Sequence, residues 1–188
     1  AIRNNLSAIK KLISPQTRLM AIVKANAYGH GMLEVAQVCV EEGASYLGVA
    51  NPHEAMVLRE NGFTTPILIL GYMPAHYAQL MVGNDIDVVV FDLDTAQVLS
   101  QAAVAANKQA QVHLKIDTGM NRLGFKPDAV SLAMIRDIVQ MPGLMVQGVF
   151  SHLATADHAD KRFARQQLET FRDFTASLEK MDICPPLK

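Results

Sequence analysis

The segment AIVKANAYGHG, residues 21–31, places one lysine at the end of a run of small apolar residues. Lys24 is followed by Tyr28 and by two glycines that flank His30. A lysine amine in a dry or positively charged environment is neutral often enough to attack a carbonyl carbon. A lysine at a strand end is more often a solvated surface residue, and Tyr28 could simply pack. The glycines that follow Lys24 favour a covalent role, because they let the backbone and a ligand approach closely.

Two later segments also place polar side chains after apolar runs. HLKIDTGMNRLGF, residues 113–125, contains Arg122, and GVFSHLATAD, residues 148–157, contains His152. Taken singly, Arg122 is more often a salt-bridge partner and His152 a satisfied core group. Lys115 lies within an apolar run, where an ammonium group is costly unless it is paired or modified. The joint placement of these groups after strands predicts one site.

Short apolar runs alternate with segments of helical spacing. Runs without strict alternation of apolar and polar residues are typical of parallel strands covered on both faces. The expected strands are residues 19–23, 46–50, 66–70, 87–91, 112–116 and 146–150. The expected helices are residues 32–42, 52–61, 75–82, 94–106, 128–140 and 160–180. The Asn51-Pro52 and Pro127-Asp128 pairs predict helix starts, and Gly43, Gly62 and Gly143 predict helix ends.

Six successive βα units fit either a doubly wound sheet or a TIM (β/α)8 barrel. The turn after the first strand reads G-H-G, which lacks the G-x-G-x-x-G pattern of dinucleotide-binding sheets. A complete barrel has eight strands and about 250 residues. We therefore expect residues 1–188 to form one domain, a truncated barrel with about six of its eight βα units. The segment ICPPLK, residues 183–188, is then the approach to a seventh strand.

Composition excludes several classes of protein. A net charge of −1 argues against nucleic acid or an anionic membrane surface as the main partner. No apolar run reaches the 18–20 residues, roughly, that a membrane span needs. His30, His53, His76 and His158 share no ligand spacing, so no metal site is expected. These observations predict a cytoplasmic protein.

The three segments resemble, in the same order, signature blocks of the alanine racemase family. AIVKANAYGHG resembles the family's pyridoxal-phosphate attachment segment, and HLKIDTGMNRLGF and FSHLATAD resemble two further blocks. The resemblance covers essentially the whole chain and favours the TIM barrel over the doubly wound sheet. It implies a pyridoxal-phosphate-dependent isomerase that interconverts L-alanine and D-alanine for peptidoglycan of the bacterial cell wall. It also implies a homodimer, with a C-terminal β domain that lies outside this chain.

The resemblance assigns roles to the residues near the first and third strands. Lys24 matches the lysine that holds the cofactor aldehyde as an internal Schiff base and then serves as a base on one face of the substrate. Tyr28 matches the tyrosine that contacts the cofactor phosphate. Leu70, at the end of the third strand, matches a residue that lines the cofactor cavity.

Three further roles follow from the same resemblance. Arg122 matches the arginine near the cofactor's phenolic oxygen, which also orients the substrate carboxylate. His152 matches the histidine placed against the pyridine ring. Lys115 matches a lysine that is often carbamylated, a change that converts a cation into an anion able to orient Arg122.

Racemisation needs a second acid/base on the opposite face of the substrate carbon, and in the family a tyrosine of the partner subunit supplies it. We therefore expect residues 1–188 alone to bind cofactor weakly and to racemise little or nothing. The alternatives are a racemase for serine or a broader set of amino acids, a non-catalytic barrel that carries pyridoxal phosphate, and a decarboxylase or aldolase on the same barrel.

Overall fold

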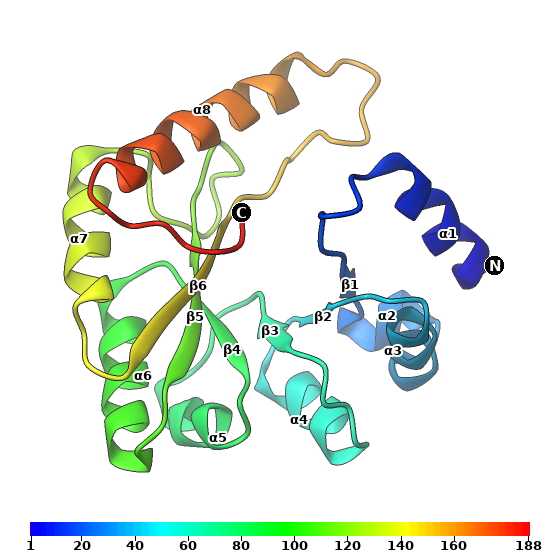
Figure 1. Cartoon of the computed structure of the whole chain (residues 1–188), viewed down its shortest axis with the longest axis horizontal. Coiled ribbons are helices and arrows are strands. Elements are labelled where there is room, and N and C mark those ends of the chain that lie inside the picture. Colours follow the sequence, from blue (N-terminus) through cyan, green and yellow to red (C-terminus); the bar gives the residue numbers. More distant parts are fainter.

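The computed structural model describes residues 1–188 and contains one sheet of six parallel strands. The strands lie in the sheet in the order in which they occur in the chain. Figure 1 shows them as an open arc with helices around its outer side. Their bounds are β1 (Met20–Ile22), β2 (Tyr46–Val49), β3 (Ile67–Ile69), β4 (Asp87–Val90), β5 (Ala110–Lys115) and β6 (Leu144–Phe150).

This sequential strand order confirms the prediction of a partial barrel. A doubly wound sheet reverses its strand order at one point, whereas here every strand pairs with its successor. All six predicted strands are present. Strands β1 and β6 are not paired with each other, so the barrel is open between them.

Helices follow each strand and cover the outer face. The six predicted helical segments are confirmed, the segment at 75–82 as a short 3-10 turn continued by a helix. The helices are α1 (Ile2–Leu12), α2 (Lys24–Gly29), α3 (Met32–Glu41), α4 (Pro52–Glu60), η1 (Ala75–Tyr77), α5 (Ala78–Gly83), α6 (Leu93–Ala106), α7 (Ala129–Val139) and α8 (Arg162–Glu179). Helix α1 and the short α2 were not predicted from periodicity.

The predicted helix boundaries have clear physical causes. The Asn51 side chain accepts the Glu54 N–H at 3.0 Å and caps α4, which begins at Pro52. The Asp128 side chain caps α7 in the same way, through the Ser131 N–H at 2.8 Å. At the other end, glycines with positive φ follow α3, α4 and α7, at positions 43, 62 and 143.

The central strands β2 to β5 are buried on both faces, as the apolar runs predicted, whereas the edge strands β1 and β6 are partly exposed. Alternate residues such as Leu47, Ile69 and Leu114 point outward into one continuous core with the helices. The intervening residues point to the inside of the arc, where Leu68 and Val89 are also buried. This two-sided burial explains why the strand sequences do not alternate between apolar and polar residues.

The inside of the arc also contains a buried polar cluster. The Tyr46 hydroxyl donates to Asp87 Oδ2 at 2.9 Å, and His113 Nε2 lies 3.2 Å from the same oxygen. Burial, followed by the negative charge of Asp87, raises the pKa of the Tyr46 hydroxyl well above its usual range. Gly148 makes room for His113, because a Cβ there would lie 2.4 Å from His113 Nδ1. His113 is therefore part of a buried hydrogen-bonded cluster inside the sheet, away from the strand ends.

The last residues of the chain run beside β6. The Val149 N–H donates to the Leu187 carbonyl at 2.9 Å, and the Leu187 N–H donates to the Gln147 carbonyl at 3.2 Å. Leu187 thus forms a parallel bridge with Gly148, which confirms that residues 183–188 approach the position of a seventh strand. A cavity of ≈ 430 Å³ lies on the inner face of the sheet. Its lining includes residues of both edge strands, such as Met20 of β1 and Phe150 of β6.

No helix of the chain has the length and apolar character to cross a membrane.

The buried polar cluster generates a stability prediction for the complete protein, meaning the protein expressed from its complete coding sequence. Asp87→Ala should lower the free energy of unfolding by about 2–4 kcal/mol, because the Tyr46 hydroxyl and the His113 ring would each stay buried without a partner. The control is Asp137→Ala, whose side chain is 62% exposed and 4.0 Å from Arg136; it should change stability by less than about 0.5 kcal/mol. Urea unfolding measures both, and equal effects would contradict the prediction.

Candidate functional site

The carboxyl ends of the parallel strands bring four predicted site residues to one rim. Lys24 comes two residues after β1, Lys115 is the last residue of β5, and His152 comes two residues after β6. Arg122 lies in the loop between β5 and α7. Strands that run in parallel all end at the same edge of a barrel, and active sites of this fold are built there. The rim is therefore the candidate site.

The charges of these groups affect one another. Burial lowers the pKa of Lys115, and the positive charges of Arg122 and then Lys24 lower it further, against the opposing charge of Asp117. Burial and the charges of Arg122, Lys115 and Lys24, in that order, lower the pKa of His152. A neutral His152 is the expected state at neutral pH, and the Lys115 amine is easier to deprotonate than a solvent-exposed lysine.

The positive rim has little compensating charge within the chain. None of Lys24, Lys115 and Arg122 forms an ion pair with a carboxylate. Lys115 is only 5% exposed, and its Nζ lies 5.8 Å from the centre of the Phe150 ring. Cations gathered without partners repel one another and attract anions. The rim is thus suited to a ligand with phosphate or carboxylate groups.

The backbone after Lys24, which forms the short element α2, is strained and is not a regular right-handed helix. Ala25, Asn26, Ala27 and Tyr28 all adopt left-handed conformations, with φ between 52° and 54°. Each such residue other than glycine costs about 1–2 kcal/mol, somewhat less for asparagine. The sequence predicted a glycine-rich turn here, and the structure shows that the non-glycine residues before Gly29 make the turn. Strain of this kind persists only where surrounding contacts impose it, and it is concentrated at functional sites.

Two side chains hold this left-handed turn. Glu54 Oε1 accepts the Ala25 N–H at 2.8 Å, while its Oε2 accepts the Ala50 N–H at 2.7 Å. Asn26 Oδ1 accepts the Met32 N–H at 2.8 Å, at the start of α3. Glu54 therefore ties the segment after Lys24 to the end of β2. Sequence reasoning did not single out Glu54, although a carboxylate in the first turn of α4 was visible.

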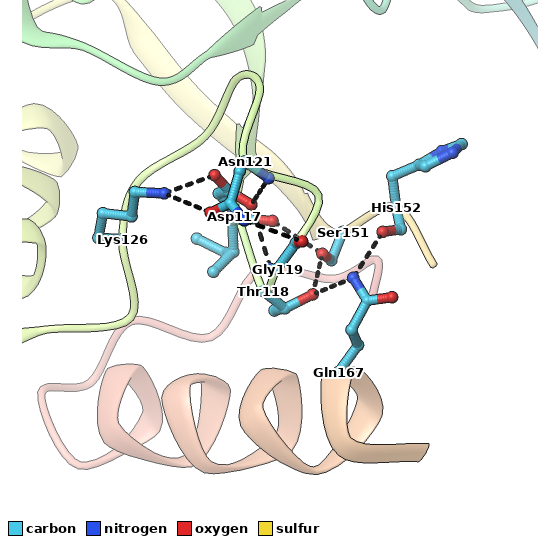
Figure 2. A network of polar contacts seen from close by, with 9 residues as sticks. Asp117, Thr118, Gly119, Asn121, Lys126, Ser151, His152 and Gln167 are labelled. Atoms are coloured by element: carbon cyan, nitrogen blue, oxygen red, sulfur yellow. Dashed lines mark hydrogen bonds and ion pairs between the residues drawn. The ribbon is translucent and has the colours of Figure 1, made fainter. Parts of the chain in front are cut away.

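The loop that carries Arg122 is organised by Asp117, as Figure 2 shows. Asp117 Oδ1 accepts the Gly119 N–H at 3.1 Å and the Asn121 N–H at 2.9 Å, and Lys126 Nζ pairs with Oδ2 at 2.7 Å. Burial raises the pKa of Asp117, but the bonds from Lys126 and the two N–H groups outweigh it, and the pKa is lowered overall. An ionised Asp117 thus fixes the loop on both sides of Arg122. The sequence signal was the D-T-G directly after the fifth strand.

The two remaining predicted residues lie at the edges of the site. Tyr28 is in the left-handed turn and is 62% exposed. Leu70 directly follows β3, and it lines the inner cavity together with Phe150. Gly48 provides space beside it, because a Cβ there would lie 3.1 Å from Leu70 Cδ1. Fold and site together define a partial α/β barrel with a cationic rim.

Comparison with known families identifies this barrel. The model of the family "Alanine racemase, N-terminal domain" matches residues 1–188. The chain therefore belongs to the alanine racemase N-terminal domain family.

Individual relatives agree with this result. The chain is 41% identical over 188 residues to an alanine racemase of Methanococcus maripaludis, covering 100% of this chain and 50% of that protein. Its structure is similar to that of alanine racemase of Clostridium difficile 630 in complex with cycloserine, with a TM-score of 0.97 and 36% sequence identity. That match covers 100% of this chain and 51% of the other. It is also similar to a histidine racemase of Leuconostoc mesenteroides, with a TM-score of 0.84 and 30% sequence identity. This match covers 92% of this chain and 46% of the other. The chain spans about half the length of these relatives.

The cationic rim generates a prediction about His152. Arg122→Gln should raise the pKa of His152, because the removed positive charge disfavours the protonated imidazole in the native site. NMR titration of the imidazole protons of the complete protein measures this shift. Arg165→Gln removes an exposed arginine from α8 and should leave the pKa unchanged. An unshifted His152 in Arg122→Gln would show that the two groups are not coupled.

Proposed function

We propose that this chain is the barrel half of a pyridoxal-phosphate-dependent racemase that acts on alanine. The observation that carries the proposal is the convergence of Lys24, Lys115, Arg122 and His152 at one rim where no carboxylate pairs with the three cations. Family membership supports the reaction and also supports a homodimeric, cytoplasmic enzyme that supplies D-alanine for peptidoglycan. The relatives are about twice as long as this chain, which is in keeping with the C-terminal β domain that the family resemblance implies.

The residues present fit pyridoxal phosphate. An anionic cofactor would offset the repulsion among the rim cations. Lys24 would hold its aldehyde carbon through Nζ, and Tyr28 would bind its phosphate. Arg122 would face its phenolic oxygen, His152 would lie against its ring, and Leu70 would line its cavity. When bound, this cofactor supplies an electron sink that stabilises negative charge on the substrate Cα.

The chain's own residues then have distinct tasks. The Lys24 amine takes the proton from Cα on one face of the substrate and returns a proton there in the reverse direction. The Arg122 guanidinium binds the substrate carboxylate and keeps the Cα–H bond directed at Lys24. Arg122 and the ring of His152 lie on loops that follow adjacent strands, so both groups are placed by the sheet. A second acid/base, supplied by a partner subunit, would serve the opposite face.

Lys115 is proposed to be carbamylated. Its buried amine has a lowered pKa, and only a neutral amine adds to carbon dioxide. The new N–C bond gives a carbamate and releases one proton. The resulting negative charge would pair with Arg122 and so remove the repulsion between the two residues. No carboxylate pairs with Lys115 in the chain, which leaves this position free for the modification.

The central prediction concerns Lys24. In the complete protein, Lys24→Ala should abolish borohydride-stable incorporation of pyridoxal phosphate and reduce alanine racemisation by at least about 10²–10⁴-fold, the usual contribution of a positioned base. Peptide mapping after borohydride, and exchange of the Cα proton of L-alanine in deuterated water, measure the two effects. Lys180→Ala at the end of α8 is the control. Labelling of any other lysine in the unmodified protein would contradict the assignment.

A second prediction concerns the modification. With ¹³C-labelled bicarbonate, the complete protein should show a carbamate carbon resonance that is absent from Lys115→Met and present in Lys180→Met. Lys115→Met should also weaken alanine binding, because Arg122 would lose the partner that orients it. A resonance that survives Lys115→Met would place the carbamate elsewhere.

A different amino-acid substrate is the second candidate. The structural similarity to a histidine racemase shows that the same half-barrel occurs with another amino acid. Measuring the exchange of the Cα proton of alanine, serine and histidine distinguishes a racemase that prefers alanine from one that prefers another amino acid. Preference for alanine by at least tenfold in kcat/KM is the expected result.

A further inference from the structure

Gln167 of α8 is a buried polar residue that the proposed reaction does not use. Its side chain is completely buried, in a helix whose neighbouring residues Gln166 and Leu168 are exposed. Burying an amide is unfavourable unless its oxygen and nitrogen both find partners. The position of those partners therefore indicates what the residue does.

All three partners of the amide lie on the loops that carry the rim residues. Gln167 Oε1 accepts the Ala154 N–H at 2.8 Å. Its Nε2 donates to the His152 carbonyl at 3.0 Å and lies 3.3 Å from Thr118 Oγ1. Figure 2 shows the His152 ring pointing away from Gln167 while the His152 backbone is held by it.

The orientation of the amide is fixed by its partners. The Ala154 N–H can only donate and the His152 carbonyl can only accept, so the oxygen and nitrogen of Gln167 cannot exchange places. A carboxylate of the same shape would lack the donor and would put negative charge against the His152 carbonyl. The site thus requires glutamine rather than glutamate.

The contacts of Gln167 extend into both loops. Thr118 Oγ1 lies 2.7 Å from Ser151 Oγ, and Ser151 Oγ donates to the Ile116 carbonyl at 2.8 Å. The loop after β5 is thereby bonded to the loop after β6. Helix α8 also packs on the first loop, because a Cβ on Gly119 would lie 2.9 Å from the Phe163 ring.

We propose that Gln167 is a positioning residue that locks the 117–126 loop and the 151–161 loop into one arrangement. The lock holds the backbone of His152 directly, and it holds the loop of Arg122 through Thr118. Arg122 and His152 then keep a fixed relation to each other and to Lys24. The effect on cofactor and substrate rests on the proposed function, whereas the coupling of the loops does not.

The test compares Gln167→Glu with Gln166→Glu in the complete protein. Both variants add one negative charge at the start of the same helix, but only the first removes the buried donor. In the cofactor-free protein, amide hydrogen exchange of residues 117–126 and 151–161 should become at least about tenfold faster in Gln167→Glu, given the cost of an unmet buried hydrogen bond. Exchange in β4 should be unchanged, and Gln166→Glu should match the parent protein. Acceleration of one loop alone, or of all segments equally, would overturn the proposal.

A second variant keeps the test decisive where Gln167→Glu fails to fold. Thr118→Val removes the hydroxyl between Gln167 and Ser151 while preserving shape. Exchange should then accelerate by a similar factor in residues 117–126 and less in residues 151–161. If the amides of residues 117–126 exchange equally slowly in Thr118→Val and in the parent protein, the proposal is overturned.

Cofactor and turnover measurements extend the test to the site. Gln167→Glu should weaken pyridoxal phosphate binding at least about fivefold in an absorbance titration and lower kcat more than it raises KM for alanine. Gln166→Glu should do neither. Unchanged affinity and kcat together with faster loop exchange would overturn the positioning role. An inactive parent protein with locked loops would instead count against the proposed reaction alone.

Discussion

The parallel pairing of β5 with β6 is the constraint on which the candidate site depends. Lys115 is in register with Phe150 at the ends of these strands, so the loops that follow must begin side by side. One loop carries Arg122 and the other carries His152. Strand β1 ends at the same edge of the sheet, and this brings Lys24 to the rim that carries Arg122 and His152. No contact between the loop after β1 and the other two loops is needed for this. The direction of the strands is thus what turns three distant segments into one rim.

The rim combines features that are unfavourable in isolation. Cations gather where the chain provides few compensating charges, and four successive residues after Lys24 are left-handed. Contacts outside the rim offset these costs: Glu54 holds the left-handed turn, Asp117 holds the Arg122 loop, and the helices bury the sheet behind them. Local strain with strong external support is typical of sites arranged in advance for a ligand. A bound anion would relieve the repulsion directly.

Much of the architecture was predictable because it depends on burial and chain direction. The six strands, the six helices that cover them and the partial barrel followed from apolar runs and from cap residues such as Asn51 and Asp128. Helix α1 was missed although Ile2, Leu6 and Ile9 recur at helical spacing in the sequence; of its residues only Leu6 is buried. The left-handed turn was also missed, since nothing in A-N-A-Y distinguishes it from an ordinary turn. Part of its support comes from Glu54, which lies 29 residues from Ala25 in the chain.

The sequence by itself determined the identity of the rim groups and the strands that they follow. Lys24, Lys115, Arg122 and His152 were recognisable because they occur together in or after apolar runs and match the signature blocks of one family. Only the tertiary structure decided the pKa shifts of Lys115 and His152 and the contacts that support the rim loops. Burial, followed by the charges of Arg122 and Lys24, lowers the pKa of Lys115. The buried amide of Gln167 is stable only because its hydrogen-bond partners lie in two other loops. Electrostatic coupling and hydrogen bonding depend on distances in space, and the number of residues between two groups in the chain does not give those distances.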